Sequence, residues 1–283
     1  SRWFTGGRGL EDFRNTMLPD KRIRILHDFL NASDCFPGVE IKGGVCYFLW
    51  DRDYQGKCKV VTHREGRISS EMDRFLLEEG FDVFVRNNEA IQVLDKVQGL
   101  KEKSFSSLIS ANDPFGFDVR VKNSYRRVKP DYKIKPYNNS VLFYYNGWRK
   151  NGIGYIDRKK IAKNINWVDE YKVLAPKAWG VGDVTKDRLR PFIIEPNSCC
   201  TETYLVIGPF KSRNICENVI SYINTKFFHF MVSLIKITQN TMQRAYAFVP
   251  MQDFTKSWVD NELYDKYGLT KEEINFIETS VCQ

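Results

Sequence analysis

The sequence predicts an α+β protein, in which the end of an α/β sheet is followed by a mixed, β-rich domain and by C-terminal helices. Residues 1–62 show one helical pattern and then three strand-like apolar runs, as expected for part of an α/β sheet. Residues 104–210 contain short β-like runs separated by Gly, Pro and Asn, which is typical of an irregular β-rich domain. Residues 213–235 and 270–281 return to helical periodicity.

The first 62 residues predict one helix and three strands. Apolar residues in 9–18 fall on one helical face, and the Pro that follows ends this helix. Residues 23–29 alternate as in a half-buried strand. The continuous apolar run 45–50 predicts a strand buried on both faces, and 58–62 is consistent with a strand that returns beside it as a hairpin. The segment therefore resembles one end of a sheet whose other strands are missing.

The remaining elements are predicted from the same periodicities. Helical patterns predict helices over 69–80 and 87–98, and a longer helical region over 213–235. Thr-Lys-Glu-Glu at 270–273 is a capping-box pattern, which predicts a helix that begins there and continues to Val281. The short β-like runs of the β-rich domain are 118–121, 141–145, 172–174, 192–194 and 204–207.

Composition indicates a soluble globular protein of the reducing cytoplasm. The chain has 283 residues, of which 42% are hydrophobic and 28% are charged, values usual for globular domains. No apolar run approaches the roughly 20 residues that cross a bilayer, so we expect no membrane partner. The seven cysteines include no Cys-x-x-Cys pair and the three histidines are scattered, so neither a disulfide framework nor a sequence-local metal site is predicted.

Positive charge is concentrated in one segment, residues 120–190. This segment carries 18 Lys and Arg residues against 6 Asp and Glu, a net charge of +12, whereas residues 1–119 and 191–283 each carry −2. Eleven aromatic residues lie in the same segment. Cations that bind phosphates release counterions, and aromatic side chains pack on sugars and bases, so the segment predicts a surface for double-stranded DNA. The alternative is a solvated basic face, which is common in proteins.

Twelve cations of this segment are the candidate DNA-binding residues. Any one of them is more often solvated than bound, so the prediction rests on the cluster rather than on a single residue. Cations that contact phosphates supply affinity, and a few Arg or polar side chains recognise base edges. The candidates are Arg126, Arg127, Lys129, Arg149, Lys150, Arg158, Lys159, Lys160, Lys177, Lys186, Arg188 and Arg190.

Several stretches resemble one family of enzymes. Ser1-Arg2-Trp3-Phe4, the stretch from Gly6 to Arg14 and the block from Asp34 to Leu49 are similar to the end of the catalytic domain of bacterial adenine-specific DNA methyltransferases. These enzymes belong to restriction–modification systems, and those with the greatest resemblance end in a TaqI-like specificity domain. Further similar stretches lie at 112–116, 201–204 and 249–260 and in the closing helix from Leu269.

The resemblance implies that the chain is the C-terminal part of such an enzyme and that its sheet is the end of a methyltransferase sheet. Residues 1–62 would be the last elements of the catalytic domain, 63–103 a helical connector and 104–283 the target-recognition domain. The chain starts at Ser1 without an initiator Met, as expected of a piece of a longer enzyme.

Two features of the family are absent from this sequence. The family binds S-adenosylmethionine through an N-terminal strand, Gly-rich loop and helix, and it transfers the methyl group with an Asn/Asp-Pro-Pro-Tyr/Phe tetrapeptide. Asn112-Asp113-Pro114-Phe115 has one Pro where that tetrapeptide has two, so it predicts a turn. The fragment is therefore expected to bind no cofactor and to contain no catalytic residue, whereas the parent enzyme uses S-adenosylmethionine.

Phe36 is the candidate for stacking on a flipped base. Methylation of a base amine within a duplex requires the base to leave the stack, and an aromatic side chain then replaces the lost stacking. In the family, the aromatic residue that opens the last motif has this role, and Phe36 is at the matching position. The alternative is a Phe that Pro37 tucks under its loop.

Two other functions remain open. Pro130-Asp131 and Glu170-Tyr171-Lys172 imitate the Pro-Asp and Glu-x-Lys elements of a metal-dependent DNA endonuclease, although the gap of 39 residues between Asp131 and Glu170 is long. The second alternative function is that of a protein-interaction scaffold without a role in DNA binding. For such a scaffold we expect binding that does not depend on salt. Thr201-Glu202-Thr203 is either a base-contacting or a cross-strand element, and we favour the structural role.

Overall fold

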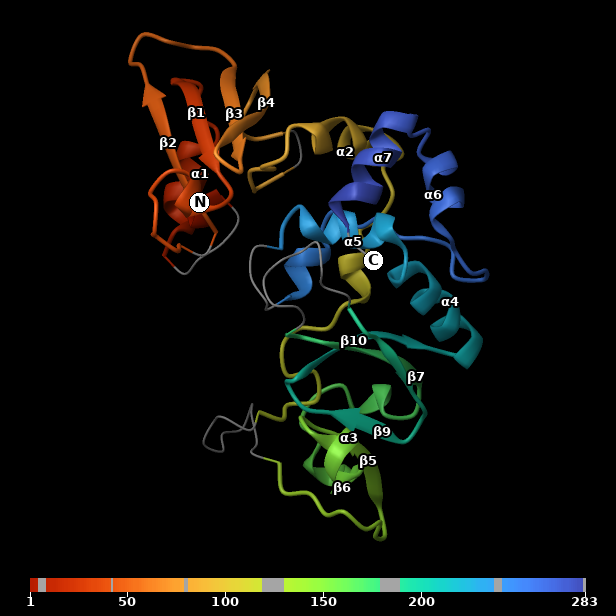
Figure 1. The fold of residues 1–283 in the computed structure, drawn as a ribbon. Coiled ribbons are helices and arrows are strands. Elements are labelled where there is room, and N and C mark those ends of the chain that lie inside the picture. The colour runs from red at the N-terminus through yellow and green to blue at the C-terminus, as the bar shows by residue number, and fades with distance from the viewer. Residues whose placement is uncertain are drawn as a thin grey trace. The chain divides into compact units, whose positions relative to one another are not determined.

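A computed structural model describes residues 1–4, 9–41, 43–78, 81–118, 130–178, 189–236 and 241–281. These residues form helices α1–α7 and strands β1–β10, which are arranged in three sheets, so the α+β class is confirmed (Figure 1). By their internal contacts, the described residues within 1–101, 233–238 and 267–276 make up one compact unit, unit 1. Those within 102–232, 239–266 and 277–283 make up unit 2.

Unit 1 contains one four-stranded sheet in the order β2-β1-β3-β4. Its strands are β1 (Ile23–Phe29), β2 (Val45–Trp50), β3 (Cys58–Arg64) and β4 (Arg67–Arg74), and its helices include α1 (Glu11–Met17) and α2 (Glu89–Gly99). The sheet buries Leu26 and Val60 in one hydrophobic core with Phe4, Leu18 and Phe84. Removing such side chains from water stabilises the sheet by about 1.5–3 kcal/mol for each.

Strand β3 pairs with β1 in parallel and does not form the predicted hairpin with β2. The loop after β2 crosses the beginning of β1, where the Asp51 N–H donates to Arg22 O at 2.9 Å and the Gly56 N–H donates to Lys21 O at 3.1 Å. These two hydrogen bonds carry the chain to the other side of β1. Strand β2 keeps the first side, where it pairs with β1 in the antiparallel direction.

Strand β2 is at the edge of the described sheet, and the prediction that both of its faces are buried is wrong. Tyr47, Phe48, Leu49 and Trp50 are all exposed, by 36–53%. A continuous apolar run is buried on both faces when the strand has neighbours on both sides and covering elements above and below. Among the described residues, β2 has one neighbouring strand, β1.

The helix predicted over 69–80 is also wrong, because residues 67–74 form β4. Glu65 and Gly66 form a two-residue hairpin turn with positive φ angles of 51° and 71°, and Arg64 pairs with Arg67 across it. Asn-Gly and Asp-Gly are the strong sequence signals for such a turn, and Glu-Gly is a weaker one. The helix predicted over 87–98 is confirmed as α2.

Unit 2 contains two three-stranded sheets, in the orders β10-β7-β8 and β6-β5-β9. The strands of the first are β7 (Tyr171–Pro176), β8 (Phe192–Ile194) and β10 (Tyr204–Phe210), and those of the second are β5 (Ser140–Tyr144), β6 (Gly154–Asp157) and β9 (Ser198–Cys200). Four of the predicted β-like runs are confirmed as β5, β7, β8 and β10, whereas β6 and β9 are not predicted. The run 118–121 lies largely outside the described residues.

The helices that follow β10 are α4 (Arg213–Ile223), α5 (Lys226–Ser233), α6 (Asp260–Lys266) and α7 (Lys271–Ser280). The helical region predicted over 213–235 is thus two helices with a break at Asn224 and Thr225. Thr225 Oγ1 accepts a hydrogen bond from the Phe228 N–H at 3.1 Å, and Asp260 accepts from the first two N–H groups of α5 at 3.1 and 2.9 Å. These acceptors satisfy the free donors of a helix start, which is why a new helix begins there.

Helix α7 begins at the predicted capping box. The Thr270 N–H donates to Glu273 Oε2 at 2.7 Å, and the Glu273 N–H donates to Thr270 Oγ1 at 3.3 Å. The described helices all lack the length and the apolar character that crossing a bilayer requires.

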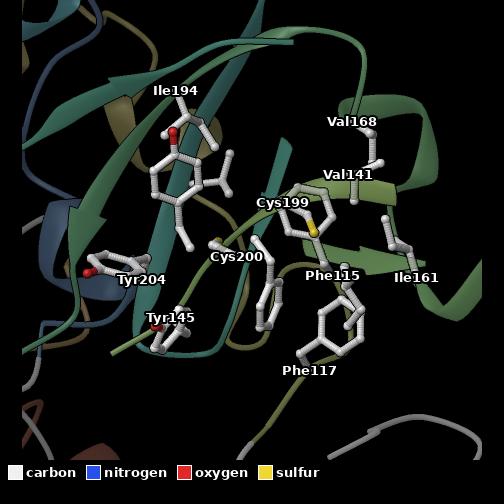
Figure 2. Close-up of a cluster of buried hydrophobic side chains, with 14 of the residues drawn as sticks. Phe115, Phe117, Val141, Tyr145, Ile161, Val168, Ile194, Cys199, Cys200 and Tyr204 are labelled. Atoms are coloured by element: carbon white, nitrogen blue, oxygen red, sulfur yellow. The ribbon is translucent and has the colours of Figure 1, made fainter. Parts of the chain in front are cut away.

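Side chains from both sheets of unit 2 form one hydrophobic core (Figure 2). Phe115 and Phe117 pack in it with Val141 of β5, and Cys199 and Cys200 of β9 are completely buried there. Burial raises the pKa of both thiols, so they remain protonated and act as small apolar side chains. The adjacent cysteines therefore contribute to packing.

Candidate nucleic-acid interface

The structure divides the twelve candidate DNA-binding cations into three groups. Arg126, Arg127, Lys129, Lys186 and Arg188 lie outside the described residues, so they stay predictions. Of the seven that are described, three have a side-chain partner. The other four are exposed and form no side-chain hydrogen bond or ion pair within the described part of the chain.

Arg158 and Lys160 form ion pairs within unit 2. Arg158 binds Asp169 with two hydrogen bonds, of which the one from Nη1 to Oδ1 is 2.8 Å long, and Lys160 pairs with Asp131 at 3.0 Å. These hydrogen bonds lower the pKa of each carboxyl. Such surface pairs contribute little to stability, because water screens both charges. They do occupy the donors that a phosphate would need, so both residues are weaker candidates than the sequence suggests.

Arg149, Lys150, Lys159 and Arg190 are the cations that remain available. All four are exposed, and none forms an ion pair with a carboxylate of the described ranges. Lys133, which is not among the twelve candidates, is also exposed in the same segment. Cations without such a partner attract phosphates with their full charge and release counterions on binding.

Arg149 lies over two aromatic rings where α3 (Trp148–Asn151) meets β8. Its guanidinium carbon is 5.4 Å from the centroid of the Trp148 ring and 5.3 Å from that of the Phe192 ring. A guanidinium above an aromatic face is attracted by the ring quadrupole, by about 0.5–1 kcal/mol at an exposed site. We call Arg149, these two rings, Tyr144 and Tyr204 the α3–β8 corner.

The rings of the α3–β8 corner hold one another in place. Trp148 Nε1 donates to Tyr204 Oη at 3.0 Å, and the Trp148 ring meets Tyr144 edge-on, with centroids 5.0 Å apart and an interplanar angle of 84°. Phe192 meets Tyr204 edge-on at 5.5 Å. Burial raises the pKa of both tyrosines, so neither phenol ionises near neutral pH. Arg149 therefore rests on rings that are packed into unit 2.

Two glycines enclose the single turn of α3. Gly147 precedes it with a φ of 92°, and Gly152 follows it with a φ of 87°. Glycine adopts these angles without the strain that a Cβ would cause. The turn brings Trp148 and Arg149 onto the surface at the end of β5. An Asn-Gly pair followed by Trp-Arg-Lys in a basic segment is the sequence signal from which this corner could have been found.

The Asn112–Phe115 tetrapeptide forms a turn, as predicted. Asp113 has a positive φ of 50°, and Lys163 Nζ binds its carboxylate at 2.6 Å. Asn112 Oδ1 accepts a hydrogen bond at 2.9 Å from Lys177, the third candidate cation with a partner. Phe115 is buried in the core of unit 2. These side chains support the fold of unit 2.

Thr201-Glu202-Thr203 has the structural role that the sequence analysis favours. Thr201 and Glu202 are buried. Thr201 Oγ1 donates to Thr203 Oγ1 at 3.0 Å, and the Glu202 N–H donates to Phe117 O at 3.1 Å. The segment joins β9 to β10 and offers no exposed base-contacting group.

Asp131, Glu170 and Lys172 do not come together as a nuclease site. Lys172 Nζ is buried and donates to three backbone carbonyls of the segment that precedes β7, at 2.5–3.2 Å. Asp131 pairs with Lys160, and the Glu170 carboxylate pairs with Lys211. In the described ranges, no three His, Cys, Asp or Glu side chains are grouped closely enough to hold a metal ion. The structure gives the endonuclease alternative no support.

Phe36 lies at the surface of unit 1, with 52% of its area exposed. It follows the short 3-10 helix η2 (Ala32–Asp34), and its N–H donates to Ala32 O at 2.8 Å. The alternative in which Pro37 tucks this residue under its loop is wrong, because half of the residue's surface is exposed. The ring is therefore accessible to a binding partner.

The loop between β1 and β2 is anchored by a buried ion pair and by a glycine. Arg86 forms two hydrogen bonds with Asp28, at 2.7 and 2.6 Å, and donates to Gly43 O at 2.9 Å. Gly44 has a φ of 68°, and a Cβ on it would lie 2.0 Å from Phe29 O. The Gly43-Gly44 pair thus packs tightly against β1.

Comparison with known proteins finds local sequence similarity to a methylase and distant structural similarity to restriction enzymes. No family model matches the chain. A stretch of 64 residues is 41% identical to an uncharacterized adenine-specific methylase of Mycoplasma pneumoniae, and it makes up 22% of this chain and 15% of that protein. The type IIG restriction endonuclease BpuSI aligns with 94% of this chain and 40% of its own, at 10% identity and a TM-score of 0.38. The type IIL restriction-modification enzyme MmeI, solved in complex with DNA, aligns with 80% of this chain and 34% of its own, at 10% identity and a TM-score of 0.34.

Each of these alignments spans well under half of the known protein. The two TM-scores are too low to establish a common fold. The similarity to a methylase is therefore local to the 64-residue stretch.

Proposed function

We propose that this chain is the DNA-binding and target-recognition portion of an S-adenosylmethionine-dependent, adenine-specific DNA methyltransferase of a restriction–modification system. The 41% identity to an adenine-specific methylase supports the enzyme class. The observation that carries the DNA-binding part is a set of cations of unit 2, Arg149, Lys150, Lys159 and Arg190, that are exposed and form no ion pair with the described residues. Arg149 among them also lies over two aromatic rings. Such a combination suits phosphates and bases.

In this proposal the two ends of the chain have different tasks. Residues 1–62 supply the last elements of the catalytic sheet and place Phe36 beside the flipped adenine, and residues 104–283 recognise the target sequence. Residues 63–103 connect the two, and these boundaries remain predictions. The proposal gives the chain a double-stranded DNA partner and no membrane partner.

The cofactor belongs to another part of the parent enzyme in this proposal. Gly43 and Gly44 do not fit its Gly-rich loop, because the Arg86 guanidinium and the Phe29 carbonyl fill the space beside them. S-adenosylmethionine would then be bound by residues outside this chain. Transfer of a labelled methyl group to DNA by the chain alone would contradict this assignment.

The first test measures how DNA binding depends on salt. Anisotropy of a labelled duplex should show an affinity that falls steeply with salt, because phosphate contacts release counterions. Replacing Lys150 and Lys159 together with Ala should weaken binding and lower the slope by about two units, about one for each lost phosphate contact. Lys211→Ala is the matched control, because this exposed Lys of unit 2 lies outside the basic segment. Binding that is indifferent to salt would favour the scaffold alternative.

The second test asks whether Phe36 stacks on an unpaired base. The chain should bind a duplex with one extrahelical adenine more tightly than the same duplex fully paired. Phe36→Ala should remove this preference, at a cost of about 1–3 kcal/mol or roughly fivefold to 150-fold in affinity. Tyr or Trp at this position should restore it, because each offers an aromatic face, and Leu should not.

A matched control is available for this test. Phe75 of unit 1 is 42% exposed, close to the exposure of Phe36, and Phe75→Ala should leave the preference unchanged. If Phe36→Ala and Phe75→Ala behave alike, Phe36 is a surface packing residue and has no part in base flipping.

A further inference from the structure

We propose that Arg149 recognises a guanine base in the bound DNA, whereas Lys150, the next residue in the chain, and Arg190 of the same basic segment contact phosphates. This inference rests on the proposed DNA-binding function and adds to it the residue that determines specificity. It depends on two properties of Arg149 and on the chemistry of the ligand. The hydrogen-bond donors of Arg149 are free of described partners, and its position is fixed by the rings beneath it. Arg149 is the one described Arg of the basic segment that combines both.

The first property is the availability of its donors. A guanidinium has five N–H groups in its plane, and stacking uses its face and leaves these edges free. The Arg149 guanidinium lies over the Trp148 and Phe192 rings, and its side chain makes no hydrogen bond to the described residues. The comparison is Arg158, whose Nη1 and Nη2 are both occupied by Asp169. Arg149 can therefore offer a complete bidentate fork, and Arg158 cannot.

The second property is a fixed position. Trp148 is held by its hydrogen bond to Tyr204 and by the edge of Tyr144, and Phe192 is held by the same two tyrosines. Arg149 therefore has fewer accessible positions than a free surface Arg, and less side-chain entropy is lost when it binds. Arg190 is exposed and has no ring contact within the described ranges, so it lacks this support.

The third step concerns the chemistry of the ligand. The O6 and N7 acceptors of guanine lie side by side in the major groove and match the Arg fork, and this pairing is the commonest specific contact in protein–DNA complexes. A phosphate also accepts two hydrogen bonds from Arg, but the apolar rings beneath Arg149 favour a base edge over a hydrated phosphate. Lys150, next in the chain, is a point charge suited to the neighbouring phosphate.

The experiment is a selection from a randomised duplex library by the 283-residue chain, repeated with variants at position 149. The wild-type chain should enrich a sequence that contains a guanine. Arg149→Lys keeps the charge and loses the fork, so it should bind that enriched duplex about tenfold to a hundredfold more weakly while its non-specific binding changes less than about twofold. Arg149→Gln should enrich adenine in place of that guanine, because Gln pairs with adenine N6 and N7.

Lys150→Ala is the matched control at the adjacent position. This variant should bind enriched and random duplexes more weakly by the same factor, and the slope of affinity against salt should fall by about one unit. The enriched sequence should not change. If Arg149→Lys and Arg149→Gln enrich the same sequence as the wild-type chain, or if they behave as Lys150→Ala does, Arg149 is not the base-contacting residue. If the wild-type chain binds DNA but enriches no sequence at all, the proposed target-recognition function is wrong, and the proposed role of Arg149 is wrong as well.

Discussion

At the residue scale, backbone geometry at a single glycine decides where the loop that carries Phe36 can lie. Gly38 and Gly44 both belong to this loop and both have positive φ angles, of 79° and 68°. A Cβ on Gly38 would meet nothing within 4 Å, whereas a Cβ on Gly44 would lie 2.0 Å from Phe29 O and 2.6 Å from Leu30 O. Both glycines therefore have a backbone conformation that favours glycine, but only at Gly44 is there no space for a Cβ.

This difference predicts unequal effects of the same substitution. Gly38→Ala should cost about 1–2 kcal/mol of stability, the usual cost of a left-handed conformation for a residue with a Cβ. Gly44→Ala should cost more than about 4 kcal/mol, because backbone atoms of β1 must also move. Hydrogen exchange of the β1 and β2 amides measures the loss of stability in each variant. Equal protection in the two variants would contradict the close packing of Gly44.

At the scale of elements, what lies beside a strand determines whether its apolar residues are buried. The run at β2 has the composition of a central strand, yet its side chains are exposed, because its one described neighbour is β1. The run at β3 is placed by two hydrogen bonds of the preceding loop, which direct it to the far side of β1. Periodicity identifies such segments as strands, but it contains no information on which neighbour each one pairs with.

At the scale of the whole molecule, unit 2 encloses ionisable groups that tie its stability to pH. Lys172 is completely buried, with its ammonium on three backbone carbonyls, and burial lowers its pKa to about 8. Burial raises the pKa values of the Cys199, Cys200 and Cys216 thiols, that of Cys216 to about 12. A buried amine and buried thiols respond to pH in opposite directions.

The pH dependence of unfolding should therefore change sign near pH 9. Between pH 8 and 9 the unfolded state keeps the Lys172 proton that the folded state loses, so stability rises with pH. Above pH 9 the unfolded thiols ionise while the buried ones keep their protons, so stability falls by up to about 1.4 kcal/mol per thiol per pH unit. Urea unfolding midpoints from pH 7 to about 10.5 measure this curve. Lys172→Met should remove the rise and keep the fall, whereas a wild-type midpoint that only falls over this range would show that the amine is not buried.

The sequence by itself determined the features that depend on neighbouring residues. The capping box at Thr270, the turn at Asn112 and the helix over 87–98 are confirmed because they rest on hydrogen bonds and periodicity within a few residues. The concentration of charge in residues 120–190 is likewise a property of the sequence alone.

Only the tertiary structure decided which of those charges are available and what lies beside them. Arg158 and Arg149 belong to the same basic segment. The carboxylate of Asp169 binds the guanidinium of Arg158. The guanidinium of Arg149 instead lies over the rings of Trp148 and of Phe192, which is distant in sequence. Such long-range contacts arise when strands and turns far apart in the chain pack into one core, and no local pattern specifies them. For this reason the sequence predicted a basic surface, and the fold selected the Arg within it that lies on an aromatic support and whose donors are free of any partner among the described residues.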